Sequence, residues 1–132
     1  MHSKDNYSLE DLHQLRLGTG PAPPPLPEGI TVEDRQIPVR DSSTIAIRIY
    51  SPTKPGASGS PSAVNYHCGG FFMGNLETEV EMCRRLVTNC NAVVLDVDYR
   101  LALEFPFPIG VDDSWDALQW LRILRALSLG YH

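Results

Sequence analysis

The chain has 132 residues, of which 42% are hydrophobic and 20% charged, and its net charge is −5. This composition and length suit one soluble domain with one modest core. The negative charge and the lack of any Lys/Arg cluster argue against nucleic acid or an anionic membrane as the main partner. No stretch approaches the ~20 consecutive apolar residues of a membrane span, and the polar start "MHSKDNYSLE" lacks an apolar signal core. We therefore expect a cytoplasmic protein without a membrane span.

Three cysteines, Cys68, Cys83 and Cys90, are too few, and odd in number, for a disulfide framework. No CxxC pair occurs, and His67 is the only histidine near them. Structural zinc sites usually show paired ligands. We predict reduced thiols that pack as small apolar groups and no metal site.

Residues 1–28 are predicted to form an N-terminal arm. A short helix is expected around "SLEDLHQLRL", where leucines recur partly at helical spacing: Leu9, Leu12, Leu15 and Leu17. The following "GTGPAPPPLPEG" holds five prolines and three glycines, which rule out regular structure. It is expected to be a linker or an extended arm over a surface.

An antiparallel hairpin is expected next. "TVEDRQIPV" (residues 31–39) is a weak strand candidate, and Pro38 suits an edge strand or a strand end. "STIAIRIY" (residues 43–50) is stronger, because its isoleucines alternate with other residues at the period of a half-buried strand. The "RDSS" between them can make the turn.

A strand–helix unit follows after a Ser/Gly/Pro-rich loop. "AVNYH" (residues 63–67) is a short apolar strand. Thr78 and Glu81 have capping-box spacing and predict the start of a helix. Its inner face is predicted to carry Val80, Cys83, Val87 and Cys90.

The last elements are a buried strand and a long helix. "AVVLDVDY" (residues 92–99) has the continuous apolar start of a strand covered on both faces. The helix is expected over residues 111–127, with acids in its first turns and arginines near its end, as the helix dipole favours. Its inner stripe is predicted from Trp115, Leu118 and Leu121 or the stem of Arg122. A right-handed crossover implies parallel strands, hence an α/β fold.

The stretch "YHCGGFF" (residues 66–72) is the main candidate for chemistry, because glycines after a strand often permit a close approach to the backbone. A phosphate loop is disfavoured, since neither G-x-G-x-x-G nor a Walker-type G-K-S/T occurs. Cys68 as nucleophile with His67 as base is disfavoured too, because adjacent residues of an extended chain point to opposite sides. A plain turn and an HGGG-type oxyanion hole both remain open on these residues.

Two sequence motifs that follow each other along the chain favour the oxyanion hole over the plain turn. "YHCGGFFMGNLETEVEMCRRLV" followed by "AVVLDVDYRLALEFPFPIGVDDSWDALQWL" resembles the α/β-hydrolase fold-3 family, the hormone-sensitive-lipase-like carboxylesterases. That family shows HGGGF-x-x-G and then V-DYRLAPE-x-PFP, and the resemblance covers about residues 26–122. It implies the N-terminal part of an α/β-hydrolase fold, with a partial domain over residues 29–132 and residues 1–28 as part of a lid.

The resemblance implies a role for each matching residue. Gly69 and Gly70 would offer backbone N–H groups to an oxyanion, and His67 with Cys68 would support the loop. Phe71 and Phe72 would pack beside an acyl pocket. The structural residues of the second motif would be Tyr99, Arg100 and Glu104.

The chain departs from the family at several points. Cys68 stands at the first glycine of HGGG, where a positive φ would cost roughly 1 kcal/mol or more. Leu103 and Phe105 replace the family's Pro and His, which puts the rigidity of that loop in doubt. No G-x-S-x-G occurs, and the other candidates, Ser114, Ser128 and His132, are poorly placed. We therefore expect the nucleophile, acid and base of a triad to be absent.

The resemblance implies a carboxylic-ester hydrolase acting on a small-molecule ester with short or medium acyl groups, without cofactor or metal. The chain itself is expected to be catalytically incomplete and inactive alone. The alternative is a non-catalytic regulatory or partner-binding remnant, or a fragment produced by a wrong gene model. If the chain ends here, "AVNYH" becomes an unpaired apolar edge strand, which predicts self-association and marginal stability.

Overall fold

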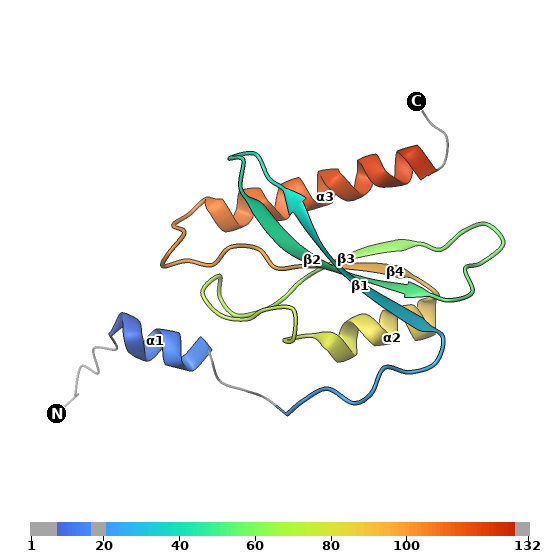
Figure 1. Ribbon diagram of the computed structural model, residues 1–132, viewed down its shortest axis with the longest axis horizontal. Helices are drawn as coiled ribbons and strands as arrows, with labels where there is room; N and C mark the ends of the chain where they lie inside the picture. Colours follow the sequence, from blue (N-terminus) through green and yellow to red (C-terminus); the bar gives the residue numbers. More distant parts are fainter. Residues whose placement is uncertain (1–7, 17–20, 129–132) are drawn as a thin grey trace.

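A computed structural model of the chain describes residues 8–16 and 21–128. The elements are α1 (Leu9–Arg16), β1 (Ile30–Pro38), β2 (Thr44–Pro52), β3 (Ser62–Tyr66), α2 (Val80–Cys90), β4 (Val93–Val97) and α3 (Ile109–Ser128). The strands form one sheet in the order β1-β2-β4-β3. Helix α2 covers one face of the sheet and α3 the other, while α1 lies to one side (Figure 1).

Strand directions follow the expected α/β plan. β1 and β2 form an antiparallel hairpin, and β2 pairs antiparallel with β4. β3 and β4 are parallel, as a crossover through α2 requires. This mixed sheet with helices on both faces confirms the predicted partial α/β-hydrolase fold.

The core has two halves, one on each face of the sheet. Ile45 and Ile47 of β2 pack with Ala117 and Leu121 on the α3 side. On the α2 side, Tyr50 and Val94 pack with Cys83 and Val87 of the helix, among others. Both faces of β4 are therefore covered, which explains its nearly continuous apolar sequence.

Helix α2 confirms part of its predicted inner face and corrects the rest. Val80, Cys83 and Val87 are buried, but Cys90 is exposed. The predicted capping box is wrong: the helix begins at Val80, and the N-cap residue Glu79 makes no side-chain cap bond. The Thr78 hydroxyl instead accepts the N–H of Asn75 at 2.9 Å, so it serves the preceding turn.

Helix α3 begins at Ile109, earlier than predicted, and its inner stripe is shifted. Gly110, Asp113, Ala117 and Leu121 are buried, whereas Trp115 is 55% exposed. Two contacts explain the rotation of the helix. A Cβ on Gly110 would lie 2.8 Å from the Arg100 carbonyl oxygen, and Asp113 pairs with Arg100. The prediction that Trp115 faces inward is therefore wrong, and that for Leu121 is confirmed.

The N-terminal arm has the predicted helix at Leu9–Arg16, although Leu17 and residues 18–20 lie outside the described part of the chain. Residues 21–27 have no regular secondary structure. Arg84 of α2 donates to the carbonyl of Pro24 at 2.6 Å, which places this segment against α2. In the described ranges no helix is both long and apolar enough to cross a membrane.

Candidate functional site

A hollow of about 480 Å³ lies at the carboxyl ends of the parallel strands β3 and β4. Loops that follow two neighbouring parallel strands meet at one edge of a sheet, where α/β folds commonly bind ligands. The wall of the hollow is mostly apolar. It consists of Tyr66, His67, Cys68, Gly69, Gly70, Phe71, Tyr99, Val111 and Ser114.

The glycine loop turns sharply at the rim of this hollow. Gly69, Gly70 and Phe71 have φ of 134°, 63° and 67°, a run that glycine favours and phenylalanine rarely adopts. The Gly69 carbonyl accepts the N–H of Phe72 at 3.3 Å and of Met73 at 3.1 Å. Among the described residues, the N–H groups of Gly69 and Gly70 have no acceptor. The turn therefore leaves two neighbouring backbone donors free beside an apolar hollow.

Cys68 tolerates its place in this loop. Its backbone does not have a positive φ, so the strain that a side chain might have caused there does not arise. The Cys68 N–H donates to Glu79 Oε1 at 3.2 Å, and the residue is exposed. His67, by contrast, is only 2% exposed.

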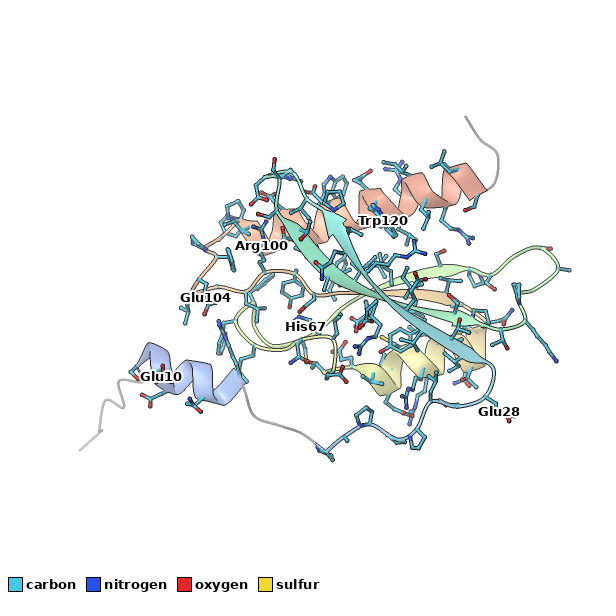
Figure 2. The ribbon with its side chains drawn as sticks, in the orientation of Figure 1. Glu10, Glu28, His67, Arg100, Glu104 and Trp120 are labelled. Carbon is cyan, nitrogen blue, oxygen red and sulfur yellow. The ribbon has the colours of Figure 1, made fainter. Side chains whose placement is uncertain are left out.

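His67 is held from several sides in the interior, beneath the loop (Figure 2). Its Nδ1 lies 3.0 Å from the Cys68 carbonyl oxygen, which requires the proton on Nδ1. Its ring stacks on Tyr99 at 4.4 Å, and the Tyr99 hydroxyl donates to the His67 carbonyl at 2.7 Å. Nε2 is buried without a hydrogen bond, and Asp98 Oδ1 is 4.0 Å away. These contacts fix the start of the glycine loop.

The two phenylalanines are placed differently. Phe71 is 56% exposed and lines the hollow, and it also lines a smaller neighbouring hollow of about 180 Å³. Phe72 is not part of either wall; its ring lies 3.4 Å from where a Cβ on Gly70 would be. Of the pair, Phe71 is therefore the one that lines the hollow.

Arg100 ties the loop after β4 to the rest of the fold. It donates to Asp113 of α3 through Nε at 2.9 Å and Nη2 at 2.7 Å, and to Asp41 through Nη1 at 2.8 Å. Its guanidinium lowers the pKa of the exposed Asp41 to about 2. It also lies 5.2 Å from the Phe105 ring centre, a cation–π contact that gives Phe105 a structural role.

Helix α1 contacts the site through the side chain of Arg16. The Arg16 guanidinium donates to the carbonyls of Phe72 and Ala102 and forms an ion pair with Glu104. Phe72 lies in the glycine loop, whereas Ala102 and Glu104 lie in the loop after β4, on the side that α1 approaches (Figure 2). The Ala102 N–H also donates to the Phe71 carbonyl at 2.8 Å. Arg16 thus bridges the two loops that flank the hollow, a contact without any local sequence signal.

A polar layer under the site was also missed by the sequence predictions. Asp96 is fully buried between the sheet and α2, and Asn65 donates to its Oδ1 at 2.8 Å. Its Oδ2 has no hydrogen bond, and burial raises the pKa of Asp96 to about 6. Burial also raises the pKa of Asp98. Asp96 lies within the otherwise apolar strand β4 and Asp98 follows directly after its end, and these two acids were the available sequence signal.

The serines discussed as nucleophiles are engaged in helix α3. The Ser114 hydroxyl donates to the Gly110 carbonyl at 2.8 Å, and the Ser128 hydroxyl donates to the Leu124 carbonyl at 2.9 Å. His132 lies outside the described residues. Within the described ranges no group of three or more His, Cys, Asp or Glu side chains is arranged to hold a metal ion.

Gly74 closes the glycine loop and gives a first prediction. Its φ is +96°, and a Cβ there would lie 2.3 Å from His67 Nδ1 and 2.7 Å from the Cys68 carbonyl oxygen. Gly59 also has a positive φ, +84°, but nothing lies within 4 Å of its would-be Cβ. We expect Gly74→Ala to lower the free energy of unfolding by about 1–3 kcal/mol more than Gly59→Ala, since only the former adds a clash to the backbone strain. Urea unfolding of both variants measures this, and equal losses would contradict it.

Comparison with known proteins gives consistent results. Residues 63–130 match the alpha/beta hydrolase fold family. The carboxylesterase NlhH of Mycobacterium tuberculosis is 36% identical over 111 residues, which are 84% of this chain and 34% of that protein. An arylesterase of Saccharolobus solfataricus is 40% identical over 93 residues, or 70% of this chain and 27% of that protein.

The solved structures that resemble this chain are esterases as well. The carboxylesterase EstE1, cloned from a metagenomic library, superposes with a TM-score of 0.64 at 43% identity, over 69% of this chain and 30% of EstE1. A bacterial heroin esterase gives a TM-score of 0.70 at 28% identity, over 80% of this chain and 33% of that chain. The chain therefore spans about a third of the length of the proteins it matches.

Proposed function

Because the chain belongs to the α/β-hydrolase fold-3 family, we propose that it carries the oxyanion-binding part of a carboxylic-ester hydrolase. The observation that carries this proposal is the pair of backbone donors at Gly69 and Gly70 beside the hollow. Two fixed N–H groups at one rim of an apolar wall can stabilise the negative charge that develops on an ester carbonyl oxygen. Such a site needs no metal ion to do so.

The proposed substrate class rests on the apolar lining of the hollow. Phe71, Val111 and Tyr66 offer apolar surface next to the two donors, which suits a short or medium acyl group. Arg16 holds α1 against the loops that border the hollow, so α1 acts as part of a lid over the bound ester. We assign His67 and Tyr99 a positioning role, because they hold the backbone of the loop and not a reacting atom.

Ester cleavage also needs a nucleophile, which the G-x-S-x-G serine supplies in α/β-hydrolases. The sequence contains no G-x-S-x-G. We propose that these 132 residues alone do not hydrolyse esters. Purified chain mixed with p-nitrophenyl acetate or butyrate is expected to release no nitrophenol above the buffer rate. Turnover that disappears on mutation of a residue of this chain would overturn this proposal.

A hybrid enzyme tests the oxyanion role directly. Residues 26–122 replace the matching segment of the mycobacterial carboxylesterase, and the hybrid is expected to hydrolyse p-nitrophenyl butyrate. In that hybrid, Gly69→Ala should lower kcat by about 100-fold or more, because its Cβ would lie 2.3 Å from the Met73 carbonyl oxygen. Gly59→Ala, remote from the hollow, is the matched control. A folded hybrid without activity, or one indifferent to Gly69→Ala, would contradict the assignment.

A further inference from the structure

The side chain of Glu79 reaches from the start of helix α2 to the beginning of the glycine loop. Glu79 is the N-cap residue of α2, yet its carboxylate makes no cap bond to the helix. Its Oε1 instead accepts the Cys68 N–H at 3.2 Å. Acids are common at helix N-termini, because the helix dipole favours negative charge there. Helix capping, however, does not account for a carboxylate that is directed at the loop.

The surroundings of Glu79 keep its side chain ionised and in place. Burial by itself would raise the pKa of this carboxyl, but the Cys68 N–H and the Asn65 side chain lower it, and the net pKa lies below its usual value. Asn65 is held in turn, since its Nδ2 donates to Oδ1 of the fully buried Asp96. Asn65 and Asp96 are also opposite each other in the parallel register of β3 and β4. The Glu79 carboxylate is therefore held from the sheet as well as from the loop.

Two successive trans peptide groups at the start of the loop have fixed orientations. The first, between His67 and Cys68, is held at both ends. Its carbonyl accepts the Tyr99 hydroxyl at 2.7 Å, and its N–H donates to Glu79. The carbonyl of the second, between Cys68 and Gly69, lies 3.0 Å from His67 Nδ1. Because a trans peptide group is planar, its N–H points away from its carbonyl. The contact of the Cys68 carbonyl therefore directs the Gly69 N–H to the other side, where no described residue accepts it.

Glu79 controls the first of these two peptide groups. Without it, the Cys68 N–H would be a third free donor next to those of Gly69 and Gly70, and its peptide group could rotate. Such a rotation would move the Cys68 carbonyl away from His67 Nδ1. We propose that Glu79 is a positioning residue of the oxyanion site, which fixes the direction of the Gly69 N–H by holding the Cys68 N–H. This inference rests on the proposed function.

The acceptor oxygen of Glu79, and not its charge, is what this role requires. A carboxylate near an oxyanion opposes the negative charge that develops in the transition state, since like charges repel. Glutamine in the same place would keep an oxygen that accepts the Cys68 N–H and would remove the charge. Methionine has a similar size but offers only a weak acceptor. The two substitutions therefore separate the hydrogen bond from the charge.

The first experiment measures amide hydrogen exchange by NMR in the chain itself. We expect the Cys68 amide to exchange about tenfold faster in Glu79→Met than in the native chain, because it loses a charge-assisted hydrogen bond. In Glu79→Gln its rate should stay close to the native rate. The buried Val94 of β4 reports on the fold as a whole and should be unaffected in both variants. A rise at Val94 as large as that at Cys68 would mean a general loss of stability and would overturn the inference.

The second experiment places the same substitutions in the hybrid enzyme. Glu79→Met should lower kcat for p-nitrophenyl butyrate about tenfold or more and leave KM nearly unchanged, because a misplacement of about 1 Å can cost about 100-fold in rate. Glu79→Gln should keep most of the kcat. Glu81→Ala is the matched control, since Glu81 lies in the first turn of α2 and forms an exposed ion pair with Arg85. It should leave both constants unchanged.

The results distinguish this inference from the proposed function. Effects of Glu79→Met on exchange and kcat that are absent in Glu79→Gln support it, whereas equal effects of the two variants, or none, overturn it. If circular dichroism shows that Glu79→Met is unfolded, Glu79→Ala takes its place. A hybrid that responds to Gly69→Ala but not to Glu79→Met keeps the proposed function and rejects the inference. A hybrid indifferent to Gly69→Ala rejects the proposed function, and the exchange rates of the chain then decide whether Glu79 holds the loop.

Discussion

Asp113→Ala is expected to lower the free energy of unfolding by about 3–5 kcal/mol, which is a large fraction of the whole stability of a domain. The Asp113 side chain is 1% exposed and accepts hydrogen bonds from the backbone N–H, Nε and Nη2 of Arg100. Alanine would leave the Arg100 guanidinium, only 15% exposed, with Asp41 as its remaining carboxylate partner. The cost arises mainly because the largely buried Arg100 guanidinium loses the carboxylate that accepts hydrogen bonds from two of its nitrogens.

Urea unfolding followed by circular dichroism measures this loss. Asp112→Ala is the matched control, because Asp112 lies in the same helical turn but is 34% exposed and pairs with a half-exposed Arg40. It should cost less than about 1 kcal/mol. The double variant Arg100→Met with Asp113→Leu removes both charges and should recover much of the loss. A single variant Asp113→Ala within about 1 kcal/mol of the native chain would contradict the assigned role.

The same ion pair explains why α3 was only partly predictable. Its existence and approximate length follow from local sequence, because apolar residues recur at helical spacing over many residues. Its rotation does not, since the contact of Gly110 with Arg100 and the pairing of Asp113 with Arg100 join residues of different elements. In the sequence, Asp113 was simply an acid in a first helical turn. In the structure Asp113 is buried, and its ion pair with Arg100 fixes the rotation of α3.

In the candidate site, too, some features were predictable from local sequence and others were not. The glycine turn and the residues that follow β4 were predictable, because short motifs carry the backbone requirements of that turn. Arg16 was not, since it contacts Phe72 and Ala102, which lie 56 and 86 residues further along the chain. Thr78 led to a wrong prediction, because its spacing from Glu81 fits a capping box, whereas its hydroxyl accepts a hydrogen bond from the Asn75 N–H. Motifs therefore predicted the loop, and tertiary contacts determined what holds it.

Asp96→Asn is expected to stabilise the chain in a pH-dependent way. Burial raises the pKa of Asp96 from its ordinary 3.8 to about 6 in the folded state. The folded state therefore binds this proton more tightly than the unfolded state. The resulting stabilisation is complete below about pH 4 and is lost as the pH rises through about 6. Above that, the native chain carries a buried carboxylate whose Oδ2 has no hydrogen bond.

Asparagine removes this charge and can still accept the bond from Asn65 through Oδ1. A shift of about two pKa units corresponds to about 3 kcal/mol at pH 8, reduced by about 1–2 kcal/mol for the buried amide group it introduces. The gain over the native chain should shrink by about half of the 3 kcal/mol when the pH falls to 5. Urea unfolding of both proteins between pH 5 and pH 8 measures the change.

Asp34→Asn provides a control of opposite sign. Asp34 is exposed, and its hydrogen bond with Arg48 lowers its pKa. A lowered pKa stabilises the folded state at neutral pH and loses that effect as the pH falls. Asp34→Asn should therefore be slightly less stable than the native chain at pH 8 and approach it in acid, whereas Asp96→Asn is more stable at pH 8. If both variants responded to pH in the same direction, net charge and not the burial of Asp96 would be the cause.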